Sequence, residues 1–319
     1  MKTILLFGKG GQVGQALQTS LARLGTIHAL DRASCNLEDG SDIRAAIRET
    51  GPAVIVNAAA YTAVDQAETD EATCTRINAI APGIMAEEAA RLGALMVHYS
   101  TDYVFDGRKT GPYREDDATN PINAYGRSKL AGDLAVAAAG GHHTILRVAW
   151  VYSAAGRNFA RTILRLAAER DRLTIVDDQF GSPTSARLIA ETTAAIIERH
   201  LHAGTKGLAA ERPANGVYHL APDGVASWHR FAVELVREAR RRGLPIRIED
   251  EQILPIPSKD YPTPAQRPAN SVLDTGKLQQ LLGGPFPHWE DDARRVVSEL
   301  AAIAQSPAAN PQAAATRSR

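Results

Sequence analysis

Two residues near the middle of the chain have the types and spacing needed for proton transfer. Tyr125 and Lys129 are four positions apart, so on a helix both side chains lie on one face. A free tyrosine has a pKa near ~10 and is a poor acid–base group at neutral pH. A neighbouring ammonium stabilises the phenolate and lowers that pKa. The spacing predicts a proton donor with an activator, although solvated surface pairs often have the same spacing.

A hydroxyl group is expected close to this pair. Thr101 and Asp102 follow the apolar run 95–99 almost directly. In an open α/β sheet, ligands bind beyond the carboxyl ends of the strands, so the Thr101 hydroxyl is placed to hydrogen-bond a substrate carbonyl. The alternative role of such a hydroxyl is to cap a local turn. With Tyr125 as proton donor, the arrangement predicts carbonyl reduction by a nicotinamide cofactor and requires no metal ion.

A glycine-rich segment, residues 8–14, follows the first apolar run and opens the first helical pattern. Glycines there permit a tight turn and let backbone N–H groups approach a pyrophosphate at the helix N-terminus. Asp31 follows Gly8 by 23 positions, near the spacing of a carboxylate that binds the adenosine ribose. Asp31 favours NAD, whereas the adjacent Arg32 can pair with the 2′-phosphate of NADP. We therefore expect NADPH and NADH both to be used.

The elements that must position these residues alternate along the first half of the chain. Short continuous apolar runs predict strands, and apolar residues at helical spacing predict the helices between them. Such strands imply a parallel sheet covered on both faces. The expected fold is α/β, a Rossmann-like doubly wound parallel sheet with a smaller C-terminal α/β substrate domain. The strands are expected at 4–7, 27–30, 53–56, 95–99 and 144–149, and the helices at 12–24, 41–48, 77–92 and 124–139.

The expected domains follow from where this alternation stops. Residues 1–152 are the dinucleotide-binding domain, with segments returning to it near 181–220, and residues 153–302 are the substrate domain. Helices are expected there at 159–168, 187–199 and 228–242, and a strand at 173–176. Five prolines within 254–270 predict an irregular segment. Residues 303–319, rich in Ala, Pro, Ser and Arg, predict a disordered tail.

Composition limits the partners. Lys plus Arg and Asp plus Glu both total 36 in 319 residues, so the chain lacks the basic field that nucleic acid or an anionic membrane attracts. Cys35 and Cys74 are too few for a disulfide framework and form no zinc motif. No apolar stretch is long enough to span a bilayer or to form a signal-peptide core. We expect a cytoplasmic protein whose partner is a small molecule.

Several longer stretches carry a family resemblance. The glycine loop, Thr101, Tyr125 and Lys129 resemble those of the extended short-chain dehydrogenase/reductases, and within them the chain resembles the dTDP-4-dehydrorhamnose reductase family over roughly residues 1 to 300. The stretch Ser-Thr-Asp-Tyr-Val-Phe-Asp-Gly at 100–107 is the most specific. The other matching stretches are 57–65, 120–126, 147–152, 178–184 and 267–268.

The resemblance implies an activity. Members of this family reduce dTDP-4-dehydro-β-L-rhamnose to dTDP-β-L-rhamnose with NADPH or NADH, the last step in making an activated sugar for cell-surface polysaccharide. It also implies roles for single residues. Together with the glycine-loop argument, it assigns to the cofactor Gly8, Gly11, Gln12, Val13, Asp31, Arg32, Asn36, Leu37, Ala59, Ala60, Tyr61, Tyr125 and Lys129. It assigns to the nucleotide sugar Thr101, Asp102, Trp150 and Arg267, and Asn78 matches an asparagine that supports the active site.

One departure from the family concerns a metal. Some members dimerise around a magnesium ion held by glutamates, and the matching positions here are Gln15, Arg187 and Glu290. A hard cation needs anionic oxygen ligands, and an arginine in the cluster repels it. We therefore expect no metal ion, and a monomer or a weak dimer.

Two alternatives remain open from the sequence. One is another nucleotide-sugar epimerase or dehydratase on the same scaffold. The other is a non-catalytic regulatory subunit similar to the β subunit of methionine adenosyltransferase. The presence of Thr101, Tyr125 and Lys129 together argues against a non-catalytic subunit.

Overall fold

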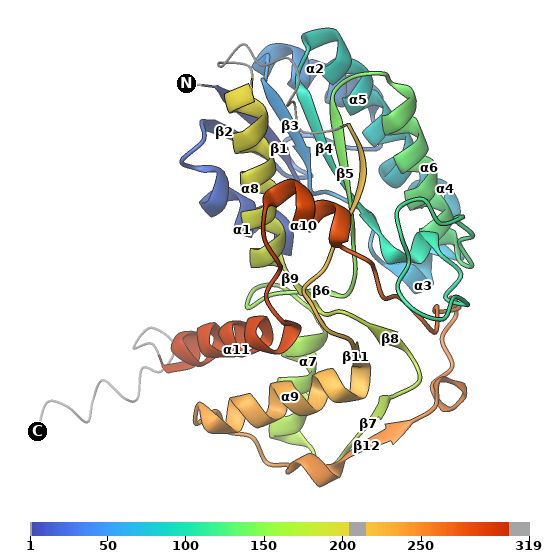
Figure 1. The fold of residues 1–319 in the computed structure, drawn as a ribbon, viewed down its shortest axis with the longest axis vertical. Coiled ribbons are helices and arrows are strands. Elements are labelled where there is room, and N and C mark those ends of the chain that lie inside the picture. The colour runs from blue at the N-terminus through green and yellow to red at the C-terminus, as the bar shows by residue number, and fades with distance from the viewer. Residues whose placement is uncertain (1, 204–214, 306–319) are drawn as a thin grey trace, which may run out of the picture.

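The central element is a six-stranded parallel sheet with the strand order β10-β5-β4-β3-β1-β2 (Figure 1). The computed structural model describes residues 2–203 and 215–305. From β1 the chain turns to β2 on one side and later to β3 on the other, so the topological switch point lies between β1 and β3. The doubly wound α/β fold expected from the sequence is confirmed. The strands are β1 (Thr3–Phe7), β2 (Thr26–Leu30), β3 (Val54–Asn57), β4 (Leu95–Thr101), β5 (His143–Val148) and β10 (Gly216–Leu220).

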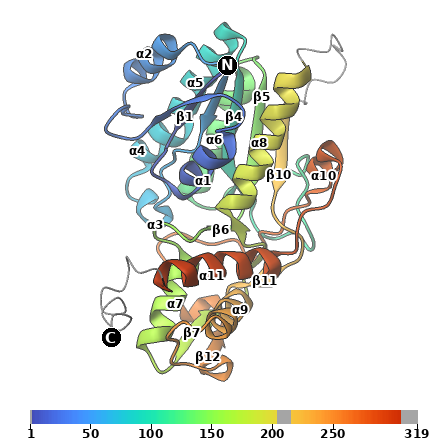
Figure 2. The same ribbon diagram turned by 90° about the vertical axis from the view of Figure 1, so that its left-hand side faces the viewer.

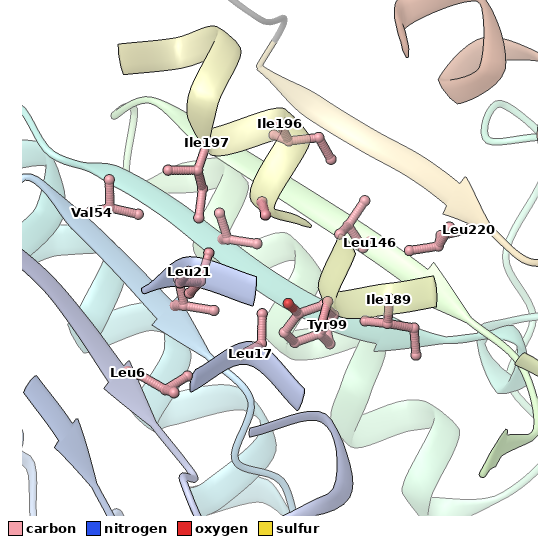
Figure 3. Packing of buried hydrophobic residues seen from close by; sticks show 14 of the residues in the cluster. Leu6, Leu17, Leu21, Val54, Tyr99, Leu146, Ile189, Ile196, Ile197 and Leu220 are labelled. Carbon is pink, nitrogen blue, oxygen red and sulfur yellow. The ribbon is translucent and has the colours of Figure 1, made fainter. Parts of the chain in front are cut away.

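Helices cover both faces of this sheet (Figures 1 and 2). On one face, α1 (Gln12–Leu21) packs against α8 (Ala186–Ala203), and Figure 3 shows Leu17 of α1 among the apolar side chains of α8 and the strands. The other face carries α2 (Gly40–Thr50), α5 (Ala81–Leu92) and α6 (Ala124–Ala138). Every residue of β3 and β4 is buried, which explains why both strands begin with three apolar residues in a row.

A second group of elements lies below the sheet in Figure 1 and has its own core. Tyr152, Phe231 and Trp289 are the large fully buried side chains of that core. Its elements are β6 (Val151–Tyr152), α7 (Phe159–Glu169), β7 (Leu173–Val176), β8 (Phe180–Gly181), β9 (Thr184–Ser185), β11 (Ala226–Ser227), α9 (Trp228–Arg241), β12 (Ile253–Ile256) and α11 (Trp289–Gln305). Three further helices are α3 (Val64–Ala67), α4 (Glu71–Thr75) and α10 (Gly276–Leu282).

One expectation about this second group is wrong. The proline-rich segment is not irregular throughout, because β12 contains Pro255 and pairs in parallel with β7. A two-stranded sheet has an open edge on each strand, where a proline without an N–H group is tolerated.

The domain boundaries stay predictions. Both α8 and β10 follow residue 153 in sequence yet belong to the layers of the N-terminal sheet. Helix α11 continues to Gln305, three residues into the segment for which disorder is expected; residues 204–214 and 306–319 lie outside the described part. None of the described helices is long and apolar enough to cross a membrane.

Close packing of the glycine loop yields a stability prediction. A Cβ atom on Gly14 would lie 2.0 Å from the Gly8 carbonyl oxygen, whereas a Cβ on Gly10 would meet no atom within 4 Å. Gly14→Ala should lower the free energy of unfolding by ~1–3 kcal/mol, which is the usual cost of overpacking a buried site. Gly10→Ala is the matched control and should change it little. Urea unfolding of both variants measures the difference, and equal stabilities would contradict the packing described.

Candidate active site

Helix α6 brings Tyr125 to the carboxyl end of β4. The Asn123 side chain caps the helix by accepting a hydrogen bond from the Gly126 N–H at 2.7 Å. A Cβ on Gly126 would lie 2.2 Å from the Tyr103 carbonyl oxygen, so only glycine lets the first turn of α6 pack on the turn after β4. The ring of Tyr103 meets that of Tyr125 edge to face, with the centroids 5.9 Å apart. Tyr125 is thereby placed next to the end of β4.

One turn further along α6, the Lys129 side chain is buried between the helix and the sheet. A Cβ on Gly132 would lie 2.1 Å from the Asn78 carbonyl oxygen, which again lets α6 approach closely. The Lys129 Nζ donates a hydrogen bond to the Tyr99 carbonyl oxygen at 2.5 Å and lies 3.4 Å from His98 Nε2. Burial lowers the pKa of Lys129 to about 8, although the carboxyl group of Asp133 opposes the shift.

Thr101 and Asp102 form a buried pair at the end of β4. The Thr101 hydroxyl donates to Asp102 Oδ1 at 2.9 Å and accepts from the Tyr103 N–H at 3.2 Å, so Thr101 also has the capping role considered from the sequence. Among the described residues, Asp102 Oδ2 has no hydrogen-bond partner. Burial raises the pKa of Asp102 to about 6. Hydrogen bonds from Ser271 and Thr101 oppose this increase in pKa, so the carboxyl group is held in place beside Thr101.

The pKa of Tyr125 differs from the expectation. Burial and the negative charge of Asp102 raise this pKa above its ordinary value, and a hydrogen bond with Thr101 opposes the increase. The ammonium of Lys129 does not lower it here, because it is held by the Tyr99 carbonyl group on the strand. A phenol with a raised pKa is fully protonated at neutral pH, which suits a group that must donate a proton.

A pocket of about 230 Å³ lies at the same edge of the sheet, beyond β1, β2 and β3. It brings together eight of the thirteen residues expected at the cofactor, while Gly11, Gln12, Val13, Tyr125 and Lys129 lie outside its lining. The expected residues in its lining are Gly8, Asp31, Arg32, Asn36, Leu37, Ala59, Ala60 and Tyr61. Five further residues that were not expected from the sequence also line it: Phe7, Leu30, Cys35, Glu38 and Ile77.

The glycine loop fits a dinucleotide pyrophosphate. Helix α1 has no side-chain cap and no acidic residue in its first turn, so its N-terminal N–H groups are available to an anion. Gly8 has a φ of +88°, and a Cβ there would lie 2.6 Å from the Ala59 backbone nitrogen. Gln12 instead joins the loop to the second group of elements, since its Oε1 accepts from Ser153 Oγ at 2.9 Å and from Asn158 Nδ2 at 2.8 Å.

Lys9 is a further residue that the sequence analysis missed, although it stands inside the glycine loop. Its Nζ lies 3.0 Å from Asp31 Oδ2, and hydrogen bonds from Lys9 and Ser34 lower the pKa of Asp31 to about 2. The Arg32 guanidinium is paired with Glu38 at 3.3 Å but is largely exposed. Two ion pairs, Lys9 with Asp31 and Arg32 with Glu38, therefore lie near the place expected for the adenosine ribose.

Comparison with known proteins agrees with this geometry. Residues 1–302 match the family described as the RmlD substrate binding domain. A curated dTDP-4-dehydrorhamnose reductase from Burkholderia thailandensis is 47% identical over 286 residues, which cover 90% of this chain and 95% of that protein. The chain belongs to the dTDP-4-dehydrorhamnose reductase family.

Solved structures of the family have the same fold. A dTDP-4-dehydrorhamnose reductase from Clostridium acetobutylicum is 32% identical with a TM-score of 0.83, and the match covers 93% of this chain and 99% of that one. The enzyme from Bacillus anthracis, solved in complex with NADP, is 31% identical with a TM-score of 0.81 over the same shares. An NADP complex within the family agrees with the dinucleotide fit of the glycine loop.

The family resemblance assigns Trp150 to the sugar, and its surroundings are unusual. Among the described residues it is the one non-glycine residue with a positive φ, 49°, a conformation that persists only when packing enforces it. Its indole stacks on Trp228 with centroids 3.6 Å apart and planes 8° apart. On Gly181 a Cβ would lie 2.7 Å from the Trp150 ring. Trp228, which the sequence analysis did not single out, thus helps to hold Trp150.

Arg267 and Asn78 are each engaged within the protein. The Arg267 guanidinium forms a two-point ion pair with Asp65, at 2.9 Å and 3.0 Å, so its contact with a phosphate stays a prediction. Asn78 is buried, accepts from the Tyr61 N–H at 2.9 Å and donates to the Tyr61 carbonyl at 3.0 Å. It supports one wall of the cofactor pocket through the backbone of Tyr61.

The positions that match the family's magnesium site hold other interactions. Arg187 pairs with Asp292 at 2.9 Å and Glu191 at 3.0 Å. Glu290 pairs with Arg230 at 2.9 Å, and Gln15 donates to the Gly10 carbonyl oxygen. Within residues 2–203 and 215–305, no group of three or more His, Cys, Asp or Glu side chains could hold a metal ion. The absence of a metal and the oligomeric state stay predictions.

Asp102 yields a prediction about stability and pH. Its pKa is raised from 3.8 to about 6 in the folded protein, so the folded state keeps a proton that the unfolded chain has lost. The stabilisation that this proton gives to the folded state is therefore fully present below pH ~4, and it is lost as the pH rises through about 6. Asp102→Asn, which stays neutral, should raise the free energy of unfolding at pH 7.5 by up to ~2–3 kcal/mol and change it little near pH 4.

Asp106 offers a control of opposite sign. Hydrogen bonds from the Arg108 N–H and the Asn120 side chain lower its pKa, so Asp106→Asn should destabilise the protein at pH 7.5. Urea unfolding at both pH values measures these changes. An Asp102→Asn variant that is equally destabilised at both would contradict the account.

Proposed function

We propose that the protein reduces the C4 ketone of dTDP-4-dehydro-β-L-rhamnose to dTDP-β-L-rhamnose with NADPH or NADH. One observation carries the proposal. The Thr101 hydroxyl meets Tyr125 at the carboxyl end of β4, on the same edge of the parallel sheet as the dinucleotide pocket. A carbonyl group bound there would have a proton donor beside it, and the pocket that would hold the nicotinamide cofactor on the same edge of the sheet.

The chain's own residues supply the acid chemistry. Tyr125 transfers its proton to the carbonyl oxygen, and the Thr101 hydroxyl would hydrogen-bond that oxygen by turning its hydrogen away from Asp102. The reduced nicotinamide supplies the hydride that forms the new C–H bond. We assign to Lys129 the role of activator, which requires its ammonium to leave the Tyr99 carbonyl group and approach the phenolate left on Tyr125. The phenolate then regains a proton from solvent. Asp102 and Trp150 orient the sugar, and Arg267 is the candidate for a phosphate contact.

The two alternatives predict different observations. An epimerase keeps its nicotinamide and returns the hydride, whereas a reductase consumes one reduced cofactor per product. A regulatory subunit would oxidise no cofactor and would capture a partner enzyme. Identity of 47% to a curated reductase over 95% of its length favours reduction. Measuring NAD(P)H consumption against product with dTDP-4-dehydrorhamnose and a panel of other dTDP-4-keto sugars decides among the three.

The adenosine end of the pocket predicts dual cofactor use. Asp31 favours the ribose hydroxyl of NADH, while Lys9 and Arg32 provide charge for the 2′-phosphate of NADPH. The ratio of kcat/KM between the two should stay below about a thousandfold, which corresponds to ~4 kcal/mol. Arg32→Ala should raise KM for NADPH and leave KM for NADH nearly unchanged. A preference above a thousandfold would refute the balance proposed.

The role of Tyr125 predicts the effect of removing one hydroxyl. Tyr125→Phe should lower kcat at least ~100-fold, since general acid catalysis contributes ~10²–10⁴, while NADPH still binds. Tyr113→Phe is the control, because the Tyr113 hydroxyl hydrogen-bonds Asp106 and has no proposed role in the chemistry. Steady-state kinetics and cofactor fluorescence measure both properties, and near-normal turnover of Tyr125→Phe would refute the assignment.

A further inference from the structure

His98, in the middle of β4, lies against the candidate catalytic lysine. Its ring is wholly buried, and Nε2 is 3.4 Å from Lys129 Nζ. The lysine makes a much shorter contact, 2.5 Å, with the Tyr99 carbonyl oxygen. The imidazole is therefore a close neighbour of the ammonium but not its strong acceptor.

The other side of the ring determines which nitrogen carries the hydrogen. Asn57 Nδ2 lies 3.2 Å from His98 Nδ1, and Asn57 Oδ1 accepts from the Ala59 N–H at 3.2 Å. A backbone N–H can only donate, so the Asn57 carbonyl oxygen faces Ala59 and its amino group faces His98. His98 Nδ1 must then be an acceptor. Burial and the charge of Lys129 hold the pKa of His98 well below its ordinary value, so the ring is neutral and its one hydrogen is on Nε2.

We propose that Asn57 selects the tautomer of His98 whose Nε2–H points at Lys129 Nζ, which makes His98 a positioning residue that favours the neutral amine over the ammonium. Two donors facing each other account for the 3.4 Å separation, which is long for a hydrogen bond. A neutral amine would accept from Nε2–H, and an ammonium cannot. The effect on turnover rests on the function of Lys129 proposed above.

The remaining neighbours of Lys129 act in the opposite direction. The Tyr99 carbonyl oxygen accepts from the ammonium, and Asp133, one turn later on α6, favours the charged form. Cys74 of α4 is a neutral thiol here, because burial raises its pKa. Part of the Asp133 charge is taken by Arg147 of β5, 3.2 Å away, and Tyr125 stays neutral below its raised pKa. The resulting pKa of Lys129, about 8, lets small changes at His98 alter its charge near neutral pH.

The tautomer can be observed without any activity. Long-range proton–nitrogen NMR spectra of the full-length protein separate the two neutral tautomers and the protonated ring. The chain has nine histidines, and the signal missing from His98→Gln identifies His98. We expect the neutral Nε2–H form from pH 8 down to pH 5.5. A ring with hydrogen on Nδ1, or one that is protonated at pH 7, would overturn the inference.

Asn57→Asp reverses the tautomer while His98 stays in place. One carboxylate oxygen accepts from the Ala59 N–H and the other from His98 Nδ1–H, so Nε2 becomes an acceptor for the ammonium. The alkaline limb of the kcat–pH profile should move upward by about one unit, and His98→Gln, which offers a carbonyl oxygen, should move it the same way. Activity that falls equally at every pH, with the limb unmoved, would show that His98 is only structural. If the wild type oxidises no NAD(P)H, the proposed function fails while the NMR result still decides the tautomer.

Discussion

The site depends on the burial of one ammonium group between a helix and a strand. Lys129 is 2% exposed and reaches the backbone of β4, which it can do only because α6 lies unusually close to its neighbours. Gly126 and Gly132 leave no room for a Cβ where the helix crosses Tyr103 and Asn78. The same close approach places Tyr125 beside Thr101. A single packing constraint thus brings Tyr125, Lys129 and Thr101 together.

Burial of ionisable groups shifts the pKa values of this site and lowers the stability of the folded protein. Asp102 has a pKa raised to about 6, and Lys129 has one lowered to about 8, so each is less stable in its charged form than in water. The Asp133–Arg147 pair behind them is buried as well. Structural ion pairs also perturb pKa values, but here the perturbed groups share a strand end beside a pocket, which is typical of functional sites.

Local sequence patterns predicted the fold and eight of the residues that line the pocket. Strands such as β3 begin with an apolar run, and the spacing of Tyr125 and Lys129 agrees with their common place on α6. What the sequence could not predict arises from contacts between distant segments. These include the Lys9–Asp31 pair, the stacking of Trp228 on Trp150, and the hydrogen bond from Lys129 to the Tyr99 carbonyl group. Because of that hydrogen bond, the Lys129 ammonium does not lower the pKa of Tyr125. The prediction of irregular structure around Pro255 was wrong for a related reason. The pairing of β12 with β7 is a contact between distant segments, which the local sequence does not reveal.

The central claim is that hydride passes from a nicotinamide to the C4 carbon of a nucleotide sugar, and isotope transfer tests it most directly. NADPH with deuterium at both C4 hydrogens is incubated with dTDP-4-dehydrorhamnose and the protein, and the product is examined by NMR and mass spectrometry. The account predicts one deuterium on C4 of the sugar for each NADPH oxidised. A product without deuterium, or one formed with no net oxidation of the cofactor, would contradict it.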